Sequence, residues 1–192
     1  MIVFRYAMRS IRFLSGNPLK IKEVNDILTK IDIKVVDVNH KINEIQTIDV
    51  PALVHDKCIK AFQKVSRPIF VEHTSLHLSH LNGFPGGLTQ VFWDTLQADN
   101  VAEIFGKTPN PAVKATTRIA YCDGKKVHQF EGEIFGTVAR EPRGNRDFQW
   151  DCIFIPDGET QTFAEMGEKK NEISMRRKAL EEFSRYLAGE AT

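Results

Sequence analysis

Strand-like and helix-like segments interleave along this chain, and their order restricts the possible folds more than any other feature of the sequence. Residues 11–14 form a short apolar run that ends in a turn at residues 15–18, and residues 20–30 then carry apolar side chains at helical spacing. Residues 31–38 are β-branched and alternate, which predicts a strand, and residues 50–65 have one apolar stripe, which predicts a second helix. The first part of the chain is therefore expected to run strand, loop, helix, strand, helix.

The rest of the chain adds strands that pair in another way. Asp123-Gly124 stands between two β-rich runs and is a strong hairpin signal, so part of the sheet is expected to be antiparallel. The other predicted segments are one or two strands in residues 68–81, a helix in 88–105, a strand in 148–156 and a helix from residue 168 onward. Because these elements interleave without strict repetition, we expect an α/β fold with a mixed, twisted sheet.

Length and charge narrow the class of protein. The 192 residues suit one domain over 1–192, and 26 Lys and Arg against 25 Asp and Glu leave a net charge of +1. This balance gives no electrostatic footprint for nucleic acid or an anionic membrane. Arg5, Arg9 and Arg12 interrupt the apolar N-terminus, so we expect no membrane span or signal peptide and a cytoplasmic location. Residues 1–10 are interpreted as an extra segment that adds an edge strand.

The turn at Ser15, Gly16 and Asn17 is a candidate anion site. Glycine permits close approach to the backbone, Asn17 and the free amides of the following helix can bond an oxyanion, and Lys20 supplies a positive charge. The pattern predicts a phosphate cradle, although it lacks the spacing of a P-loop. An ordinary capped helix after a turn is the alternative that these residues alone leave open.

Aromatic residues mark a candidate base-binding segment. Phe148 and Trp150 fall on one face of the predicted strand, and Asp151 stands beside them. Two aromatic rings can stack on a planar base while a carboxylate accepts a hydrogen bond from its ring N–H. The alternative is an ordinary core pair followed by a turn aspartate.

Basic residues gather where the last predicted helix begins. Lys169, Lys170, Arg176, Arg177 and Lys178 form a run of the kind that is usually a solvated helix face. The same side chains can instead donate to phosphates or to base carbonyls.

Two carboxylates and three histidines raise the question of a metal. Glu44 and Glu72 are the kind of pair that a hard divalent cation binds if the fold brings them together. The spacing of His73, His77 and His80 suggests zinc on a helix, but the surrounding alternation predicts a strand with His80 on the opposite face. A shared zinc site is therefore not expected.

Taken together and in order, these segments resemble the inosine triphosphate pyrophosphatase family, which cleaves deaminated purine nucleoside triphosphates (ITP, dITP, XTP) to monophosphate and pyrophosphate. The resemblance runs from about residue 11 to residue 180. The residues that carry it are Ser15-Gly16-Asn17 with Lys20 and Glu23, Asn43-Glu44-Ile45-Gln46, Lys57, Val71-Glu72-His73-Thr74, residues 82–86, Glu131-Gly132, Pro142-Arg143-Gly144, Phe148-Gln149-Trp150-Asp151, residues 163–166 and residues 170–176. No single motif decides the match, but the ordered set is highly specific.

The resemblance implies a fold with two lobes around a central cleft, and a homodimer. It implies that Phe148 and Trp150 flank the purine while Asp151 and Arg176 read the edge that carries the 6-oxo group. It also places Met175 where the family's S-H-R motif has a histidine near the base or α-phosphate.

The resemblance assigns the phosphates and the metal as well. The loop after the first strand would hold the triphosphate, together with Lys20, Lys57 and Lys170. Glu44 would help to hold Mg²⁺, with Glu72 as a second carboxylate at a weakened site.

Two departures from the family pattern bear on catalysis. His73 replaces an aspartate that helps to organise the metal and activate water, and Met175 replaces the S-H-R histidine. Imidazole is a poor ligand for Mg²⁺, so water activation is expected to suffer. The favoured hypothesis is a sensor of dITP, ITP or XTP with weak or lost hydrolysis, which signals to an effector protein in stress or antiviral defence. The alternative is an active Mg²⁺-dependent pyrophosphatase that cleanses nucleotide pools, with His73 and Glu72 as catalytic residues and His73 as general base.

Overall fold

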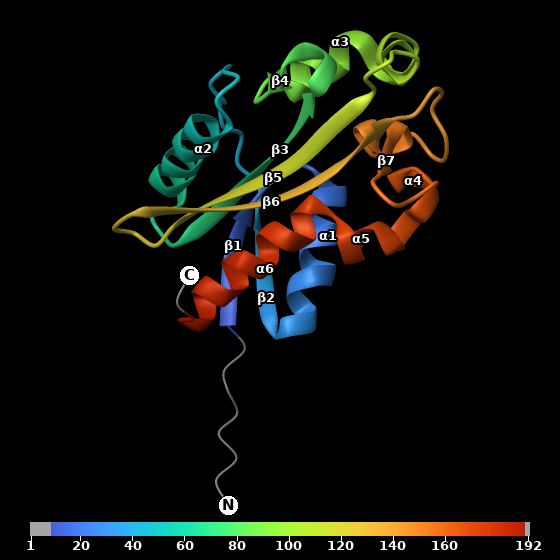
Figure 1. Ribbon diagram of the computed structural model, residues 1–192. Coiled ribbons are helices and arrows are strands. Elements are labelled where there is room, and N and C mark those ends of the chain that lie inside the picture. Colours follow the sequence, from blue (N-terminus) through green and yellow to red (C-terminus); the bar gives the residue numbers. More distant parts are fainter. Residues whose placement is uncertain (1–8, 191–192) are drawn as a thin grey trace, which may run out of the picture.

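A seven-stranded mixed sheet organises residues 9–190, the part of the chain that the computed structural model describes (Figure 1). The strand order is β2-β1-β3-β5-β6-β7, and β4 pairs with β3 outside this path. Strands β2, β1 and β3 run parallel, whereas β3, β5, β6 and β7 pair antiparallel. The strands are β1 (Arg9–Leu14), β2 (Ile33–Val38), β3 (Ile69–Leu78), β4 (Pro85–Gly86), β5 (Ala112–Cys122), β6 (Val127–Val138) and β7 (Phe154–Pro156). The expected mixed α/β sheet and the hairpin are confirmed.

Helices cover both faces of this sheet (Figure 1). They are α1 (Pro18–Leu28), α2 (Val50–Val65), α3 (Thr89–Val101), α4 (Phe163–Met166), α5 (Lys170–Ile173) and α6 (Met175–Ala188). Alternation along β3 determines the faces, because Phe70 packs with α1 and α6 while its neighbour Val71 packs with α2. Within residues 9–190, no helix has the length and apolarity needed to cross a membrane.

The turn after β1 and the loop after β2 meet at one edge of the sheet. The strands are parallel, so their carboxyl ends coincide, and the Ser15 backbone N–H donates to the Val38 carbonyl at 3.3 Å. Helix α1 begins directly after the turn, with Asn17 as N-cap and Pro18 in the first turn. Parallel topology therefore puts the predicted phosphate loop at the edge where ligands of such sheets bind.

The predicted strand over residues 148–156 is wrong in its first part. Gln149–Ile153 form a 3₁₀ turn, and only Phe154–Pro156 form a strand. Gln149 has φ of 44°, a left-handed conformation that takes the chain out of extended geometry. Phe148 and Trp150 consequently do not share a strand face.

The predicted C-terminal helix is divided. Ser174 is extended, with ψ of 155°, and its hydroxyl caps α6 by accepting from the Arg177 backbone N–H at 3.2 Å. Serine is a favoured N-cap residue, so a new helix begins at Met175. At the other end of the chain, Arg9 and Ser10 belong to β1, which lies between β2 and β3 and is not an edge strand. The remainder of the expected extra segment, residues 1–8, lies outside the described residues.

Candidate functional site

A cavity of about 460 Å³ opens at the carboxyl edge of the parallel strands. We call it the loop cavity, and its lining includes Ser15, Gly16, Asn17, Lys20, Glu44 and Lys57. An added Cβ on Gly16 would meet no atom within 4 Å, so the backbone of the turn faces open space. The cavity thus combines an accessible glycine backbone, a helix N-terminus and two lysines, which is the chemistry of an anion site.

The turn itself is ordered by its own side chains. The Asn17 Oδ1 accepts hydrogen bonds from the backbone N–H groups of Leu19 (2.9 Å) and Lys20 (3.2 Å). The Ser15 hydroxyl accepts from the Asn17 N–H at 3.2 Å. The capped-helix interpretation is therefore confirmed, and it is compatible with a cradle because the capped turn still lines the cavity.

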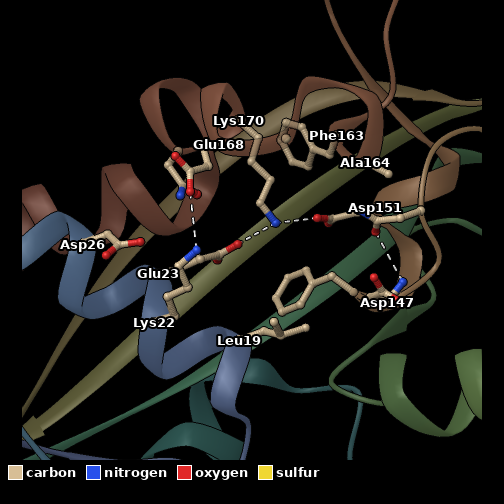
Figure 2. Close-up of a pocket in the computed structure, with 14 residues that line it drawn as sticks. Leu19, Lys22, Glu23, Asp26, Asp147, Asp151, Phe163, Ala164, Glu168 and Lys170 are labelled. Carbon is tan, nitrogen blue, oxygen red and sulfur yellow. Dashed lines mark hydrogen bonds and ion pairs between the residues drawn. The ribbon is translucent and has the colours of Figure 1, made fainter.

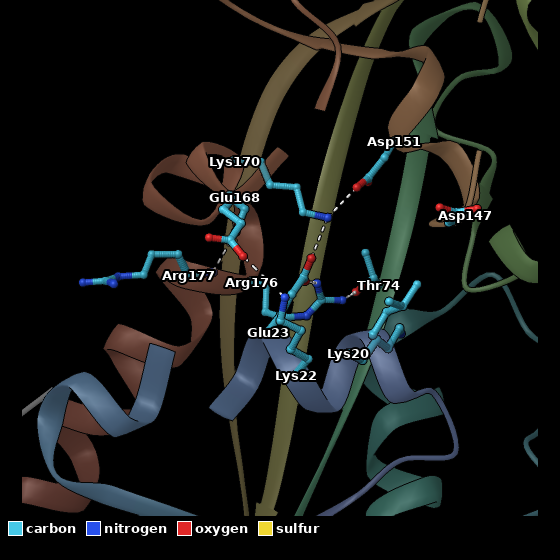
Figure 3. A network of polar contacts seen from close by, with 12 residues as sticks. Lys20, Lys22, Glu23, Thr74, Asp147, Asp151, Glu168, Lys170, Arg176 and Arg177 are labelled. Carbon is cyan, nitrogen blue, oxygen red and sulfur yellow. Dashed lines mark hydrogen bonds and ion pairs between the residues drawn. The ribbon is translucent and has the colours of Figure 1, made fainter. Parts of the chain in front are cut away.

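Arg176 is the centre of a buried ion-pair network next to the loop cavity (Figure 3). Its side chain is 1% exposed, and its Nε and Nη2 donate to the two carboxylate oxygens of Glu72 at 2.8 and 3.1 Å. Nη1 donates to Glu23, and Nη2 also reaches the Thr74 hydroxyl at 3.3 Å. Burial acts to lower the pKa of Arg176, but Glu72 and Glu23 outweigh it and raise the pKa above its ordinary value. The guanidinium is therefore committed to the protein.

Glu72 is bound by a second cation, Lys20, whose Nζ lies 3.1 Å from Oε1. Burial alone would raise the pKa of Glu72, but Arg176 and Lys20 lower it to about 2. Burial lowers the pKa of Lys20 despite its contact with Glu72. Glu72 is thus an ionised carboxylate with both oxygens occupied by cations.

A second cavity, of about 210 Å³, is lined by Glu23 of this network and is called the Phe148 cavity. Figure 2 shows Lys170 between Glu23 and Asp151 at this cavity. Its walls include Phe148, Asp151, Lys170 and Glu23. The Lys170 Nζ lies 2.5 Å from a Glu23 oxygen, contacts Asp151, and lies 4.1 Å from the centroid of the Phe148 ring. Burial raises the pKa of Asp151 to about 6, against the opposing effect of Lys170. The cavity offers an aromatic surface beside one acceptor and one donor.

The opposite face of β3 carries a third hollow, of about 220 Å³, where His73 meets Glu44 and Lys57. Lys57 Nζ lies 2.8 Å from Glu44 Oε1, and His73 Nδ1 lies 3.9 Å from Glu44 Oε2. Burial would raise the pKa of Glu44, but Lys57 outweighs it and the pKa is lowered. Burial, Lys20 and Lys57 lower the pKa of His73 to about 4, so its imidazole is neutral near pH 7.

Comparison with known proteins identifies the family of this chain. Residues 11–186 match the Ham1 family. The chain belongs to the Ham1 family. A protein of Methanopyrus kandleri named dITP/XTP pyrophosphatase is 35% identical over 176 residues, covering 91% of this chain and 94% of that protein. An inosine triphosphate pyrophosphatase of Yarrowia lipolytica is 36% identical over 186 residues, covering 95% of this chain and 97% of that protein.

A solved structure shares the fold of this Ham1 chain. The HAM1 protein from Coxiella burnetii superposes with a TM-score of 0.79 at 24% identity, over 95% of this chain and all of that one. At this identity the likeness supports the fold alone.

Most of the predicted site residues line the cavities described above, but three of them are buried in the interior of the protein. Trp150 is 2% exposed and packs edge-on against Phe154, away from both cavities. Met175 is buried in the same core cluster, and Arg176 is enclosed by its carboxylate partners. Lys170, expected at the phosphates, lines the Phe148 cavity instead. The 3₁₀ turn and the break at Ser174 account for these differences.

Sequence reasoning gave no role to Glu23 or Gln149. Glu23 joins Arg176 to Lys170 and so connects the two cavities. Gln149 lines the loop cavity and donates from Nε2 to Gln90 Oε1 at 2.5 Å, linking the 3₁₀ turn to α3. A signal for Gln149 was available in the resemblance, because the family motif that Phe148-Gln149-Trp150-Asp151 resembles, F-G-[WY]-D, has glycine at this position.

The donors around the loop cavity do not fit Mg²⁺. Among residues 9–190 no three His, Cys, Asp or Glu side chains gather at one point. Glu72 is occupied by Lys20 and Arg176, so of the predicted Glu44–Glu72 pair only Glu44 keeps an oxygen free of a cation. The nearest further donor is the His73 imidazole, and Mg²⁺ strongly prefers oxygen. No catalytic step is therefore assigned to Mg²⁺.

Proposed function

We propose that this chain is a nucleoside triphosphate pyrophosphatase that acts on deaminated purine nucleotides such as ITP, dITP and XTP. The observation that carries the proposal is the pairing of a lysine-lined loop cavity with an aromatic cavity that holds one acceptor and one donor. The names of the relatives support the reaction class, because the matches to these relatives cover more than nine-tenths of this chain. The same names favour the active-enzyme alternative over the sensor interpretation.

The loop cavity would take the triphosphate. Backbone amides at a helix N-terminus and the dipole of α1 favour phosphate oxygens, and Lys20 and Lys57 add positive charge. Both lysines are already paired with carboxylates, so the phosphates compete for their ammonium groups with Glu72 and Glu44. The anion that enters therefore has to carry several charges, as a triphosphate does.

The Phe148 cavity would select the base. A deaminated purine presents a 6-oxo acceptor beside an N1–H donor, whereas adenine presents an amino donor beside an acceptor nitrogen. Lys170 can donate to the 6-oxo group, and ionised Asp151 can accept from N1–H. Adenine would instead place its amino donor against Lys170 and its acceptor nitrogen against ionised Asp151, and such mismatched contacts are costly in a buried site. Phe148 adds stacking surface.

The reaction consumes one water and breaks the anhydride between the α- and β-phosphates. It yields a nucleoside monophosphate and pyrophosphate and releases a proton. We assign water activation to Glu44 and His73. Glu72 and Glu23 have both carboxylate oxygens bound to cations, whereas Glu44 binds Lys57 through Oε1 and keeps Oε2 on the side of His73. Asp151 lines the Phe148 cavity. The network itself acts by positioning Lys20 and Lys170.

The direct test measures pyrophosphate release from ITP, dITP, XTP and ATP with divalent cations, beside calorimetric binding of the same nucleotides. We expect turnover of ITP, dITP or XTP in the usual range of about 1–1,000 per second, with ATP at least about a hundredfold slower. Equal rates for ITP and ATP would remove the role assigned to Asp151 and Lys170.

A second candidate is a sensor that binds the nucleotide without cleaving it. Its support is the replacement of an expected aspartate by His73, whose Nε2 is buried without a hydrogen-bond partner among the described residues. Tight binding of ITP without pyrophosphate would favour the sensor and contradict the enzyme. A homodimer and an effector partner also stay predictions, to be tested by sedimentation and by co-purification.

A further inference from the structure

Two consecutive residues, Phe148 and Gln149, line different cavities. Phe148 lines the Phe148 cavity, whereas Gln149 lines the loop cavity and the hollow at His73. The proposed function puts the base in the first cavity and the triphosphate in the second. A nucleotide carries its sugar between its base and its phosphates, so the sugar has to pass Gln149.

The side-chain amide of Gln149 is oriented from helix α3. An ionised carboxylate only accepts hydrogen bonds, so Gln90 turns its Nε2 toward Asp94 and donates to Oδ1 at 2.8 Å. The Oε1 of Gln90 then faces Gln149 and accepts from its Nε2 at 2.5 Å. Among residues 9–190 the Oε1 of Gln149 accepts no hydrogen bond. Asp94 therefore determines, through Gln90, that Gln149 has an oxygen acceptor to offer to a ligand.

The backbone of Gln149 is also unusual for a residue with a long side chain. Its φ of 44° lies in the left-handed region, which glycine adopts without a steric penalty. A glutamine in this conformation costs conformational energy, and such residues are concentrated at ligand sites. The backbone therefore gives a second reason, independent of the hydrogen bonds, to look for a ligand of this side chain.

We infer that Gln149 reads the sugar of the bound nucleotide, with its Oε1 accepting a hydrogen bond from the ribose 2′-hydroxyl. The inference rests on the proposed function, which supplies the nucleotide. The 2′-carbon is bonded to the carbon that carries the base, and Gln149 directly follows Phe148 at the base, so the 2′-hydroxyl is the sugar hydroxyl on the matching side. Deoxyribose lacks this donor, so the site favours ITP over dITP.

The test compares the α,β-methylene analogues of ITP and dITP, which cannot be cleaved, by calorimetric binding to the full-length chain. We expect the ribose analogue to bind roughly 2–10-fold more tightly, the effect of one neutral hydrogen bond. Gln149→Gly removes the amide and suits the left-handed turn, so the ratio of the two affinities should fall to about 1. Gln90→Met leaves Gln149 without its anchor and should lower the same ratio without lowering the melting temperature.

The matched control is Gln97→Gly. Gln97 is another exposed glutamine of α3 with a left-handed φ, of 60°, and it lines none of the three hollows described above. This substitution should leave the ratio unchanged. Gln149→Asn, which withdraws the amide by one methylene and tolerates the same backbone, is measured in parallel, with thermal melting as the check that each variant folds.

Equal affinity of the wild-type chain for the two analogues, or a ribose preference that survives both Gln149 substitutions, would overturn the inference. A preference that survives Gln90→Met alone would overturn the positioning role of Gln90. Pyrophosphate release from ITP and dITP by a chain that binds both analogues equally would keep the enzyme proposal and remove the sugar contact. A chain that prefers ribose through Gln149 but releases no pyrophosphate supports the sugar contact and contradicts the enzyme proposal.

Discussion

The Phe148 cavity and the loop cavity lie on either side of Arg176, and they differ in how their charges are used. In the first, Lys170 binds both Asp151 and Glu23, and the three side chains hold a fixed pattern of donor and acceptor. In the second, the turn at Gly16 faces open space and the lysines are paired with single carboxylates. A cation held by two carboxylates provides fixed geometry, whereas a lysine with a single carboxylate partner can change partners when an anion arrives. The first region is suited to selection of a base and the second to capture of phosphates.

Replacing Arg176, which lies between the two cavities, is expected to have the largest effect of the substitutions considered. Arg176→Met leaves Glu72 and Glu23 as buried carboxylates short of a cation, and breaking a buried ion pair in this way costs about 3–5 kcal/mol. The free energy of unfolding in urea is the measurement. The matched control is Arg177→Met, which removes only an exposed pair with Glu181 and should cost less than about 0.5 kcal/mol. Similar losses for the two variants would show that the network does not stabilise the fold.

Lys57→Met should affect binding more than folding. A charged hydrogen bond to phosphate is worth about 1.5–3 kcal/mol, so the dissociation constant for ITP should rise roughly 10–100-fold. Lys64→Met changes an exposed lysine of the same helix and should leave calorimetric binding unchanged. An unaltered affinity in Lys57→Met would place the triphosphate elsewhere.

The pH dependence of stability distinguishes the carboxylates of the network. Burial raises the pKa of Asp151 to about 6, so its stabilising contribution is complete below the ordinary value of 3.8 and is lost as the pH rises through 6. The side chain in Asp151→Asn cannot titrate. The free energy of unfolding of this variant should therefore rise relative to that of the wild type across this window, by about 1–3 kcal/mol. Urea unfolding of both chains across the window measures the gain. A difference that does not vary with pH would show that Asp151 does not titrate as its burial implies.

The contribution of Glu72 to stability depends on pH with the opposite sign. Arg176 and Lys20 hold its pKa at about 2, so its contribution is present above the ordinary value of 4.5 and is lost only as the pH falls toward 2.

The smallest expected effect concerns the turn. Asn17→Ala removes the N-cap of α1 and should lower stability by about 1 kcal/mol. Asn17→Ser retains a capping oxygen and should restore both stability and ITP affinity, because the turn geometry and not the amide itself forms the cradle. Weak ITP binding by a stable Asn17→Ser chain would assign Asn17 a direct contact.

Several features could be predicted from residues alone because their causes are local. Asn17 and Pro18 indicate the start of α1, and Asp123-Gly124 indicates the hairpin that joins β5 and β6. Such signals depend on capping and turn chemistry within a few residues. The ordered motifs also indicated the family, and the resemblance to that family implied the cleft.

Other features could not be predicted from neighbouring residues in the sequence. Gln149 adopts a left-handed conformation that few non-glycine residues take, so the expected strand becomes a 3₁₀ turn and Trp150 enters the core. The burial of Arg176 depends on Glu72 and Glu23, which are more than a hundred residues away in sequence.

The sequence by itself determined the alternation of strands and helices, the capped turn at Ser15–Asn17 and the family pattern with its exchange of aspartate for His73. These follow from side-chain chemistry that acts over short distances along the chain. Only the tertiary structure decided which charges face one another. Alternation along β3 sends Glu72 toward Arg176 and His73 toward Glu44, so two adjacent residues serve different sites.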